Sequence, residues 1–314
     1  MSDERHWSAV AERGSMAALR AMAWIYGALG RSVCQLLLYP IVAYFFLRDS
    51  RSRRASRAYL DLVWANPEGR SQLRRRPGLL APLRHYHEFA VQLLDRMVLW
   101  GGGFHRFQMD HAGSEHLFDL ARAGRGGILL GAHVGSFDMA RQLAGEHQLA
   151  INLVMFTAHA ARINRFFEQL SSGDRVKVLQ LDPTSVQPAF RIRECIKHGE
   201  FVGILGDRIP PGGRERPVFV DFLGRRAAFP RSPFLLACVL GCPILLSICV
   251  RTGEARYETF VEPLGEGRYI PRADRDKAVE ELAELFVRRL EKICLRFPYQ
   301  WFNFHDTWQD GSEL

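Results

Sequence analysis

Short apolar runs alternate with helix-like segments from residue 126 onward, and this alternation limits the possible fold more than any other feature of the chain. The apolar runs that predict buried strands are 126–132, 151–156, 176–181 and 201–205. The segments between them that predict helices are 138–146, 158–170 and 186–197. Strands that alternate with helices build a mostly parallel sheet flanked by helices, so the sequence predicts an α/β fold.

The rest of the chain extends this fold. Further strands are predicted at 218–222, 243–250 and 257–261, and a long amphipathic helix is predicted at 274–295. Residues 55–123 are mostly helix-like and are expected to pack across the sheet. A chain of 314 residues, 47% of them hydrophobic and without an internal repeat, can bury one large core. We therefore expect a main domain at 51–314, preceded by a separate N-terminal segment at 1–50.

The N-terminal segment contains the most apolar part of the chain. Residues 33–47 carry no charge, and this stretch of about 15 residues is short for a bilayer that needs roughly 20. Extension past Arg31 to Trp24 supplies the missing length. Three structures fit: a tilted span with Arg31 displaced towards an interface, a membrane-surface hairpin broken near Pro40, and a buried core helix. No small-residue cleavage site follows Phe46, so we do not expect a cleaved signal peptide.

Positive charge is concentrated directly after this apolar segment. The chain has 42 basic and 34 acidic residues. Much of the excess comes from Arg48, Arg51, Arg53, Arg54, Arg57, Arg70, Arg74, Arg75 and Arg76. Arginines beside an apolar segment favour a cytoplasmic location for the residues downstream and would bind an anionic membrane surface. Because they adjoin this segment and no recognition motif is present, we expect no nucleic-acid partner.

A histidine followed five positions later by an aspartate occurs three times. The pairs are His105–Asp110, His133–Asp138 and His305–Asp310. Roughly one such match is expected by chance, so spacing alone is weak evidence. Only His133 directly follows an apolar strand and precedes a predicted helix, which places it at the edge where open α/β sheets bind ligands.

The predicted chemistry of His133 follows from its two ring nitrogens. A hydrogen bond from Nδ1 to Asp138 would fix the tautomer and leave Nε2 free to remove a proton from a hydroxyl or amine. Without a strand before it, a histidine at a helix start is more often a capping or packing residue. We therefore predict that His133 and Asp138 form a general-base dyad.

Two further sites are candidates for binding an anionic substrate group. Asp207 and Arg208 follow the predicted strand 201–205, so they should reach the same sheet edge as His133. Arg208 could bind a phosphate while Asp207 orients it, although an ordinary loop ion pair has the same sequence pattern. Arg225 is a second candidate for an anion site. The six cysteines show no Cys-x-x-Cys pair, which fits a reducing compartment.

Four blocks of sequence resemble a known family. Residues 126–141 resemble the first motif of the lysophospholipid acyltransferase-like superfamily. The other blocks, 199–213, 216–251 and 296–308, resemble the bacterial lipid A biosynthesis (lauroyl/myristoyl) acyltransferase branch, whose ending reads Pro-x-Gln-Trp. Together the blocks cover most of residues 120–310 in order. They are far more specific than the histidine motif alone.

This resemblance implies a glycerolipid acyltransferase-like fold with an N-terminal membrane helix on the cytoplasmic face of the bacterial inner membrane. It implies acyl transfer from a carrier thioester, on acyl carrier protein or coenzyme A, to a hydroxyl of a lipid or glycolipid, without a metal or other cofactor. Asp138 stands where the branch typically has Glu, and the loop at Asp207 also departs from the branch. Within the superfamily, the chain looks most similar to a subgroup found with aryl-polyene or xanthomonadin-type pigment pathways.

Two other functions remain open at this stage. One is a non-catalytic, membrane-bound lipid-binding protein on the same fold. The other is a metal-dependent hydrolase that uses His133 and Asp138 as ligands together with a third ligand from elsewhere in the chain.

Overall fold

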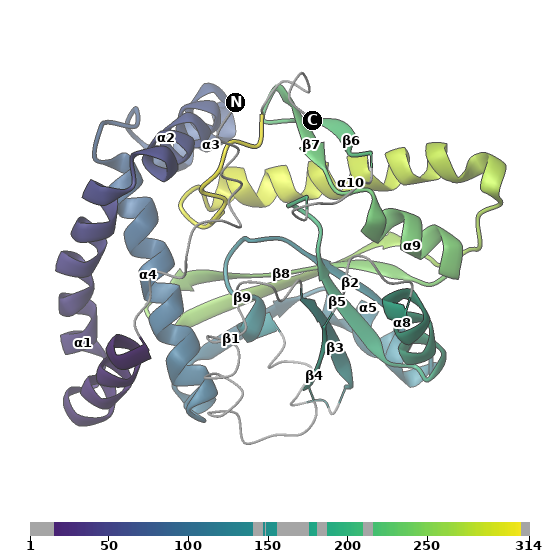
Figure 1. The fold of residues 1–314 in the computed structure, drawn as a ribbon, viewed down its shortest axis with the longest axis horizontal. Helices are drawn as coiled ribbons and strands as arrows, with labels where there is room; N and C mark the ends of the chain where they lie inside the picture. Colours follow the sequence, from purple (N-terminus) through teal and green to yellow (C-terminus); the bar gives the residue numbers. More distant parts are fainter. Residues whose placement is uncertain are drawn as a thin grey trace.

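A computed structural model gives the fold of the chain and describes residues 16–140, 147, 149–155, 176–180, 187–209 and 216–308. Its centre is a seven-stranded sheet with the order β1-β9-β8-β2-β5-β3-β4 (Figure 1). The strands are β1 (Gln108–Ala112), β2 (Gly127–Gly131), β3 (Ile151–Met155), β4 (Val176–Gln180), β5 (Phe201–Leu205), β8 (Ile244–Gly253) and β9 (Arg256–Gly265). Every neighbouring pair is parallel except β8 and β9. The predicted mostly parallel sheet is therefore confirmed.

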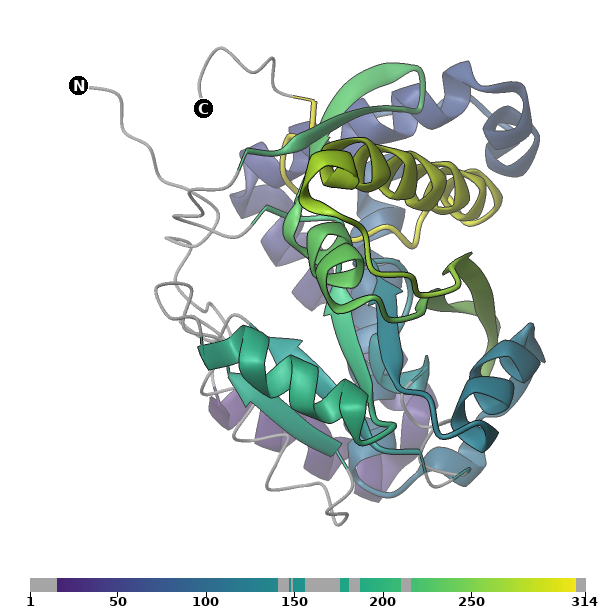
Figure 2. The same ribbon diagram turned by 90° about the vertical axis from the view of Figure 1, so that its right-hand side faces the viewer.

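Helices cover both faces of this sheet. The helices α8 (Gln187–Lys197), α9 (Ser232–Leu240) and α10 (Arg275–Arg296) pack on one face, where Ile128 and Ile204 point. The helix α5 (Ser114–Arg122) packs on the other, against Leu129 and Val261. Figure 2 shows the strands between α8 and α5. Since β2 is buried on both faces, its sequence is uniformly apolar and does not alternate.

The hairpin β6 (Val218–Phe222) and β7 (Arg225–Phe229) forms a separate antiparallel sheet that packs beside α10. The sequence predicts β6 as a strand but does not predict β7. Inward and outward positions alternate along β6, as expected for a strand with one buried face.

Four helices precede and flank the sheet. They are α1 (Met16–Arg48), α2 (Ser50–Ala65), α3 (Pro67–Leu73) and α4 (Ala81–Trp100). Two short 3₁₀ helices, η2 (Phe104–Arg106) and η3 (Arg272–Asp274), lie in connecting segments. The expectation that 55–123 is mostly helical is therefore confirmed, except that β1 lies within it.

The helix α1 runs beside α4 at the left of Figure 1. Its helical conformation is interrupted at Gly30, where φ is 80° and ψ is −178°, and it continues through Pro40. The expectation of a hairpin broken near Pro40 is therefore wrong, because the break falls at the glycine, which adopts this φ without a Cβ clash. Among the described residues, one helix is long and apolar enough to cross a membrane, at Trp24–Arg48.

The remaining helix predictions have different outcomes. The predicted helix at 186–197 is confirmed as α8. A helix begins at Phe137, but most of 138–146 and the whole of 158–170 lie outside the described residues. The end of α1 and the start of α2 flank residue 49, close to the predicted division of the chain at residue 50.

Candidate active site

Two adjacent parallel strands bring His133 and Asp207 together. The strands β2 and β5 pair in register, with Gly131 opposite Leu205, and each candidate follows its strand by two residues. The Nδ1 atom of His133 lies 2.7 Å from Oδ1 of Asp207. The sequence prediction that both residues reach one edge of the sheet is consistent with this arrangement.

Asp207 is almost completely buried, at 1% exposure, and its carboxylate accepts three hydrogen bonds. Oδ2 accepts from the backbone N–H of His133 at 2.8 Å and from Nε1 of Trp301 at 3.0 Å. Burial alone would raise the pKa of Asp207, but the charge and hydrogen bond of His133, with the charge of Arg208, hold it well below its ordinary value. Asp207 is therefore a stable anion that can orient the imidazole.

The imidazole of His133 is partly open, with 28% of its side chain exposed. Burial and the positive charge of Arg208 lower its pKa, and Asp207 opposes them by raising it. The neutral ring donates Nδ1–H to the ionised Asp207, which leaves the lone pair on Nε2. This tautomer can accept a proton from a bound hydroxyl group.

The loop after His133 is fixed by backbone hydrogen bonds to the C-terminal segment and, from the N–H of Ser136, to the carbonyl of Cys249 on β8 at 2.7 Å. The N–H of Phe302 donates to the carbonyl of His133 at 2.7 Å, and the N–H of Gly135 donates to the carbonyl of Gln300 at 2.9 Å. Gly135 has a φ of 63°, and a Cβ at this position would lie 1.9 Å from the carbonyl oxygen of Cys249. The turn therefore requires glycine, and it holds His133 in one position.

The structure corrects the predicted partner of the Nδ1 atom of His133. Asp138 lies in the first turn of the helix after the loop, and its Oδ2 is 2.8 Å from Nε of Arg96 on α4. The carboxylate on Nδ1 is that of Asp207. The turn at Gly135 directs the following helix towards α4. Asp138, five residues after His133, therefore lies beside Arg96. A part for Asp138 in catalysis stays a prediction.

Arg208 and Arg225 lie in different surroundings. Nε of Arg208 donates to Oδ1 of Asn303 at 2.9 Å, and Nη2 donates to the carbonyl of Phe302 at 2.7 Å. Arg208 thus holds the C-terminal segment, while Asp207 is engaged by His133. Arg225 is exposed at the start of β7, opposite Phe222. The structure brings His133, Asp207 and Arg208 together and places Arg225 on the hairpin.

Neither His105 nor His305 directly follows a described strand of the sheet. His105 is exposed in η2, and Asp110 pairs with Arg256, with Oδ2 at 2.8 Å from Nε. His305 is partly buried, and Asp310 lies outside the described residues. Within the described part of the chain, no three His, Cys, Asp or Glu side chains are grouped so that they could hold a metal ion.

Trp301 is a site residue that the sequence analysis did not identify. It is fully buried, and its carbonyl lies 2.8 Å from Nε2 of His85, which is also buried. Burial lowers the pKa of His85 to about 3, so this histidine is neutral. Its Nδ1 lies 2.9 Å from Oγ of Ser56 on α2. The Pro-x-Gln-Trp ending was visible in the sequence, but only the fold shows that it contacts Asp207.

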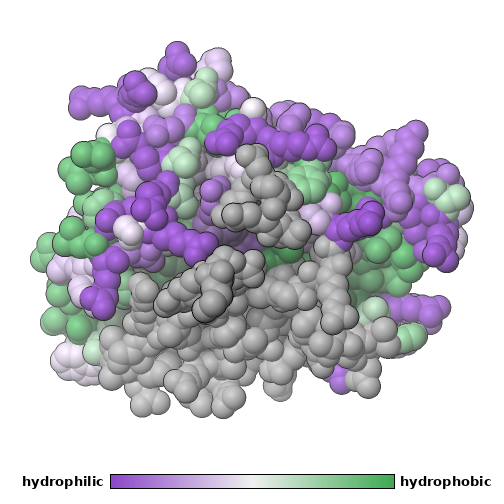
Figure 3. Space-filling view, turned by 45° about the horizontal axis from the view of Figure 1, so that its top comes forward, coloured by the Kyte–Doolittle hydropathy of each residue, from purple (hydrophilic) through white to green (hydrophobic). Residues whose placement is uncertain are grey.

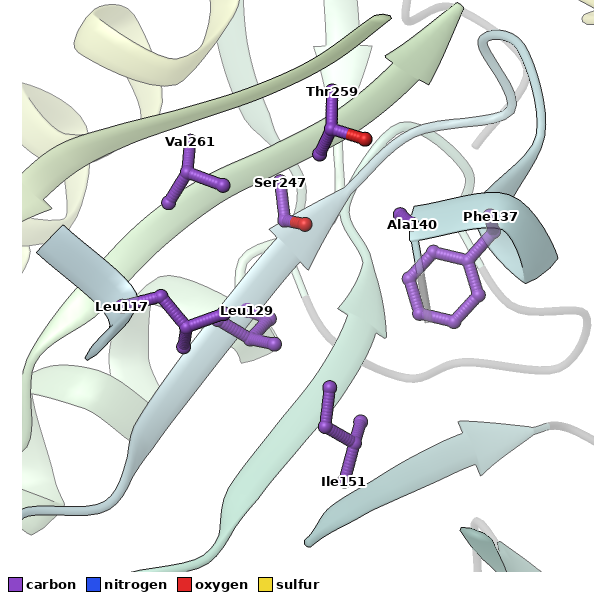
Figure 4. A pocket seen from close by; sticks show the side chains of 8 residues that line it. All are labelled: Leu117, Leu129, Phe137, Ala140, Ile151, Ser247, Thr259 and Val261. Carbon is purple, nitrogen blue, oxygen red and sulfur yellow. The ribbon is translucent and has the colours of Figure 1, made fainter. Parts of the chain in front are cut away.

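A small apolar cavity lies on the α5 face of the sheet, beside the helix that begins at Phe137 (Figure 4). Its lining residues are Leu117, Leu129, Phe137, Ala140, Ile151, Ser247, Thr259 and Val261. Gly131 and Gly203 leave room for the ring of Phe137, since a Cβ on Gly203 would lie 2.8 Å from its Cζ. The cavity is thus walled by a residue only four positions after His133.

Comparison with known proteins identifies the family. No individual curated protein matches the chain. The model of the bacterial lipid A biosynthesis acyltransferase family matches residues 15–310, a range that includes α1, the whole sheet, the loop at His133 and the C-terminal segment that clamps it. The chain therefore belongs to the bacterial lipid A biosynthesis acyltransferase family.

Proposed function

We propose that the protein transfers an acyl group from a carrier thioester to a hydroxyl of a lipid or glycolipid, with His133 as general base and Asp207 as the carboxylate that orients it. The contact between Nδ1 of His133 and Oδ1 of Asp207 at 2.7 Å carries this proposal. Membership of an acyltransferase family supports the reaction type. The partly exposed ring of His133 supports access by a substrate.

The reaction follows from the tautomer of His133. Nε2 takes the proton of the acceptor hydroxyl while its oxygen attacks the thioester carbonyl carbon. The tetrahedral intermediate collapses with cleavage of the carbon–sulfur bond, and the imidazolium returns the proton to the departing thiolate. A positioned base contributes about 10²- to 10⁴-fold, and the remaining acceleration comes from positioning both substrates and stabilising the oxyanion.

Apolar side chains beside the site support an acyl or lipid substrate. Phe89 and Leu93 are partly exposed at 36% and 39%, and they share one face of α4 with Arg96. The ring of Phe89 lies 5.1 Å from that of Phe302, whose N–H binds the carbonyl of His133. We propose that the acyl chain or the lipid acceptor contacts this rim. The cavity behind Phe137 is a second candidate for the chain.

The finer assignments are also proposals. Arg208 and Arg225 are candidates for binding a phosphate of the donor or acceptor, and acyl carrier protein and coenzyme A both supply one. Asp138 stands where the branch typically has Glu, which favours an acceptor other than lipid A, as in the aryl-polyene or xanthomonadin-type subgroup. The basic segments α2 and α3 support a location on the anionic cytoplasmic face of the inner membrane.

A thioester-consumption assay tests the activity. Purified full-length protein is mixed with acyl carrier protein or coenzyme A thioesters and membrane lipid extract, and free thiol is followed together with acylated lipid by mass spectrometry. The wild type should release thiol in step with lipid acylation, and His133→Ala should do neither while keeping its circular dichroism spectrum. Normal turnover by His133→Ala would disprove the general-base role.

The same purified protein can be used to distinguish the proposed acyl transfer from the two alternative functions. Tight vesicle binding without thioester consumption, for every donor and acceptor, would indicate a lipid-binding protein. Stoichiometric zinc or manganese by elemental analysis, with activity lost on chelation, would indicate a metal-dependent hydrolase. Mass spectrometry of lipids from cells with and without the gene would then identify the acceptor as the species that lacks one acyl group.

A further inference from the structure

The helix α1 is docked lengthwise on α4. Cys34, Leu38 and Val42 are buried at 0%, 6% and 4% exposure, and they follow one face of α1 at four-residue intervals. Cys34 and Leu38 form a core cluster with Val91 and Leu94 of α4. One side of α1 therefore packs its apolar side chains against the body of the protein.

A buried ion pair fixes this docking. Arg31 donates from Nε and Nη2 to Oδ1 of Asp95, at 3.1 and 2.9 Å, and from Nη2 to Oδ2, at 2.9 Å. Asp95 is fully buried and also accepts a hydrogen bond from the hydroxyl of Tyr257 on β9, at 2.8 Å. Arg31 therefore pairs with a carboxylate inside the protein, which differs from the predicted displacement towards a membrane interface.

The helix α4 belongs to the body of the protein and cannot enter hydrocarbon. Gln92 donates to the side chain of Gln300 at 2.8 Å, and Glu88 accepts hydrogen bonds from Arg251 of β8, one of them at 2.7 Å. A span must cross about 30 Å of apolar lipid. If α1 crossed it while docked, the charged sheet-facing side of α4 would lie at the same depth. Docked α1 is therefore incompatible with a transmembrane position.

The opposite side of α1 is exposed and apolar. The side chains on this face after the break at Gly30 are Leu36 at 68% exposure, Tyr39 at 60%, Tyr44 at 57% and Leu47 at 75%. Only 17% of the apolar window within Trp24–Arg48 is buried. Figure 3 shows hydrophobic residues along the left edge, where α1 lies, below a hydrophilic band over the N-terminal helices. Exposed arginines of α2, including Arg51 and Arg54, follow α1 directly in the chain.

We propose that α1 does not cross the bilayer but lies along the surface of an anionic leaflet. Its Leu36–Leu47 face is inserted among the lipids, while Arg31 holds its other face to Asp95. An apolar stripe followed by arginines matches the chemistry of such a surface, in which acyl chains lie below phosphate groups. This arrangement places the whole catalytic body on one side of the membrane together with both ends of α1.

Cysteine labelling tests the topology. Leu29 and Ser50 are exposed residues at the two ends of the part of α1 that follows the break at Gly30, separated by about 30 Å of helix. Leu29→Cys and Ser50→Cys are expressed separately as full-length protein and treated with a membrane-impermeant maleimide in intact spheroplasts and in inside-out vesicles. Of the six native cysteines, five are buried and one is partly buried, so background labelling should be low. Labelling of both variants only in inside-out vesicles is expected, and labelling from opposite sides would overturn the proposal.

Vesicle flotation tests the inserted face with a matched control. The double variant Leu36→Gln/Leu47→Gln should bind vesicles of phosphatidylglycerol and phosphatidylcholine at least tenfold more weakly than the wild type. The control is Phe190→Gln on α8, because Phe190 is similarly exposed, at 61%, and lies far from α1. The control should bind as the wild type does. Unchanged vesicle binding by the double variant would show that lipid does not cover this face. The same conclusion would follow if the wild type were a dimer without lipid and the double variant were a monomer.

Discussion

Replacement of Asp207 by asparagine tests the centre of the proposed mechanism. Oδ2 of Asp207 accepts two N–H groups, from the His133 backbone and from Trp301, so the amide oxygen of the introduced asparagine would take this position. The amide NH₂ would then face Nδ1 of His133, where Oδ1 now lies at 2.7 Å. Since NH₂ is a donor, Nδ1 would have to be the acceptor, and the proton would move to Nε2. With a proton on Nε2, His133 could not remove a proton from the acceptor hydroxyl.

The expected effect is therefore the loss of base catalysis, which amounts to about 10²- to 10⁴-fold in kcat. The same substitution in the serine-protease triad, a worked example of this tautomer effect, lowers kcat by about 10⁴-fold. Thiol release is measured under saturating donor for Asp207→Asn and for Asp138→Asn, with circular dichroism to check folding. Nearly normal kcat for Asp207→Asn, together with inactive Asp138→Asn, would refute the assignment and restore Asp138 as the essential carboxylate.

Four further results are expected. Trp301→Phe removes one hydrogen bond to a charged Asp207, so the free energy of unfolding should fall by about 1.5–3 kcal/mol in urea titrations, with a smaller loss of kcat than in Asp207→Asn. Gly135→Ala places a Cβ in a strained turn and should destabilise the protein by more than about 2 kcal/mol, measured in the same way. The pKa of His133 is lowered from its ordinary value of 6.5, so the imidazole stays neutral as the pH falls to that value, and the midpoint of the acidic limb of the kcat/KM profile should lie below pH 6.5. The pKa of His85 is about 3 in the folded protein and 6.5 as its ordinary value, so the unfolded chain binds the proton first as the pH falls. The free energy of unfolding should therefore decrease by up to about 1.4 kcal/mol per pH unit between pH 6.5 and pH 3, and it should decrease less in His85→Gln.

The sequence predicted the sheet well because β2 and β5 are buried on both faces and read as continuous apolar runs. It failed for β1, which is largely exposed and polar, and for β7, which begins with two exposed arginines and so carries no continuous apolar run. The strand β1 lies at the edge of the sheet beside β9. Prediction from apolar runs therefore works for strands buried in the core and fails for strands with exposed polar positions, whose pairing the local sequence does not signal.

The same reasoning explains the outcome at the site. That His133 and Asp207 share one edge follows from strand order alone, since both strands end there. The choice between two carboxylates does not follow from it. Asp138 is close to His133 in sequence, but the direction of the turn at Gly135 depends on a clamp from Gln300 and Cys249 that no local pattern reveals. Trp301 was missed for the same reason, because its role exists only through a contact with a residue 94 positions away.

The helix α4 links the two proposals. Asp95 holds α1 through Arg31, and the next residue, Arg96, holds Asp138 beside the site. Consecutive helix positions point about 100° apart, so the α1-facing residues Val91 and Leu94 and the active-site rim lie on different sides of α4. The rim residues Phe89 and Leu93 are exposed on α4, so they stay open to a lipid acceptor while α1 lies on the leaflet surface. Because the apolar rim side chains would contact the lipid, mutation of this rim should raise KM for a lipid acceptor more than for a water-soluble one.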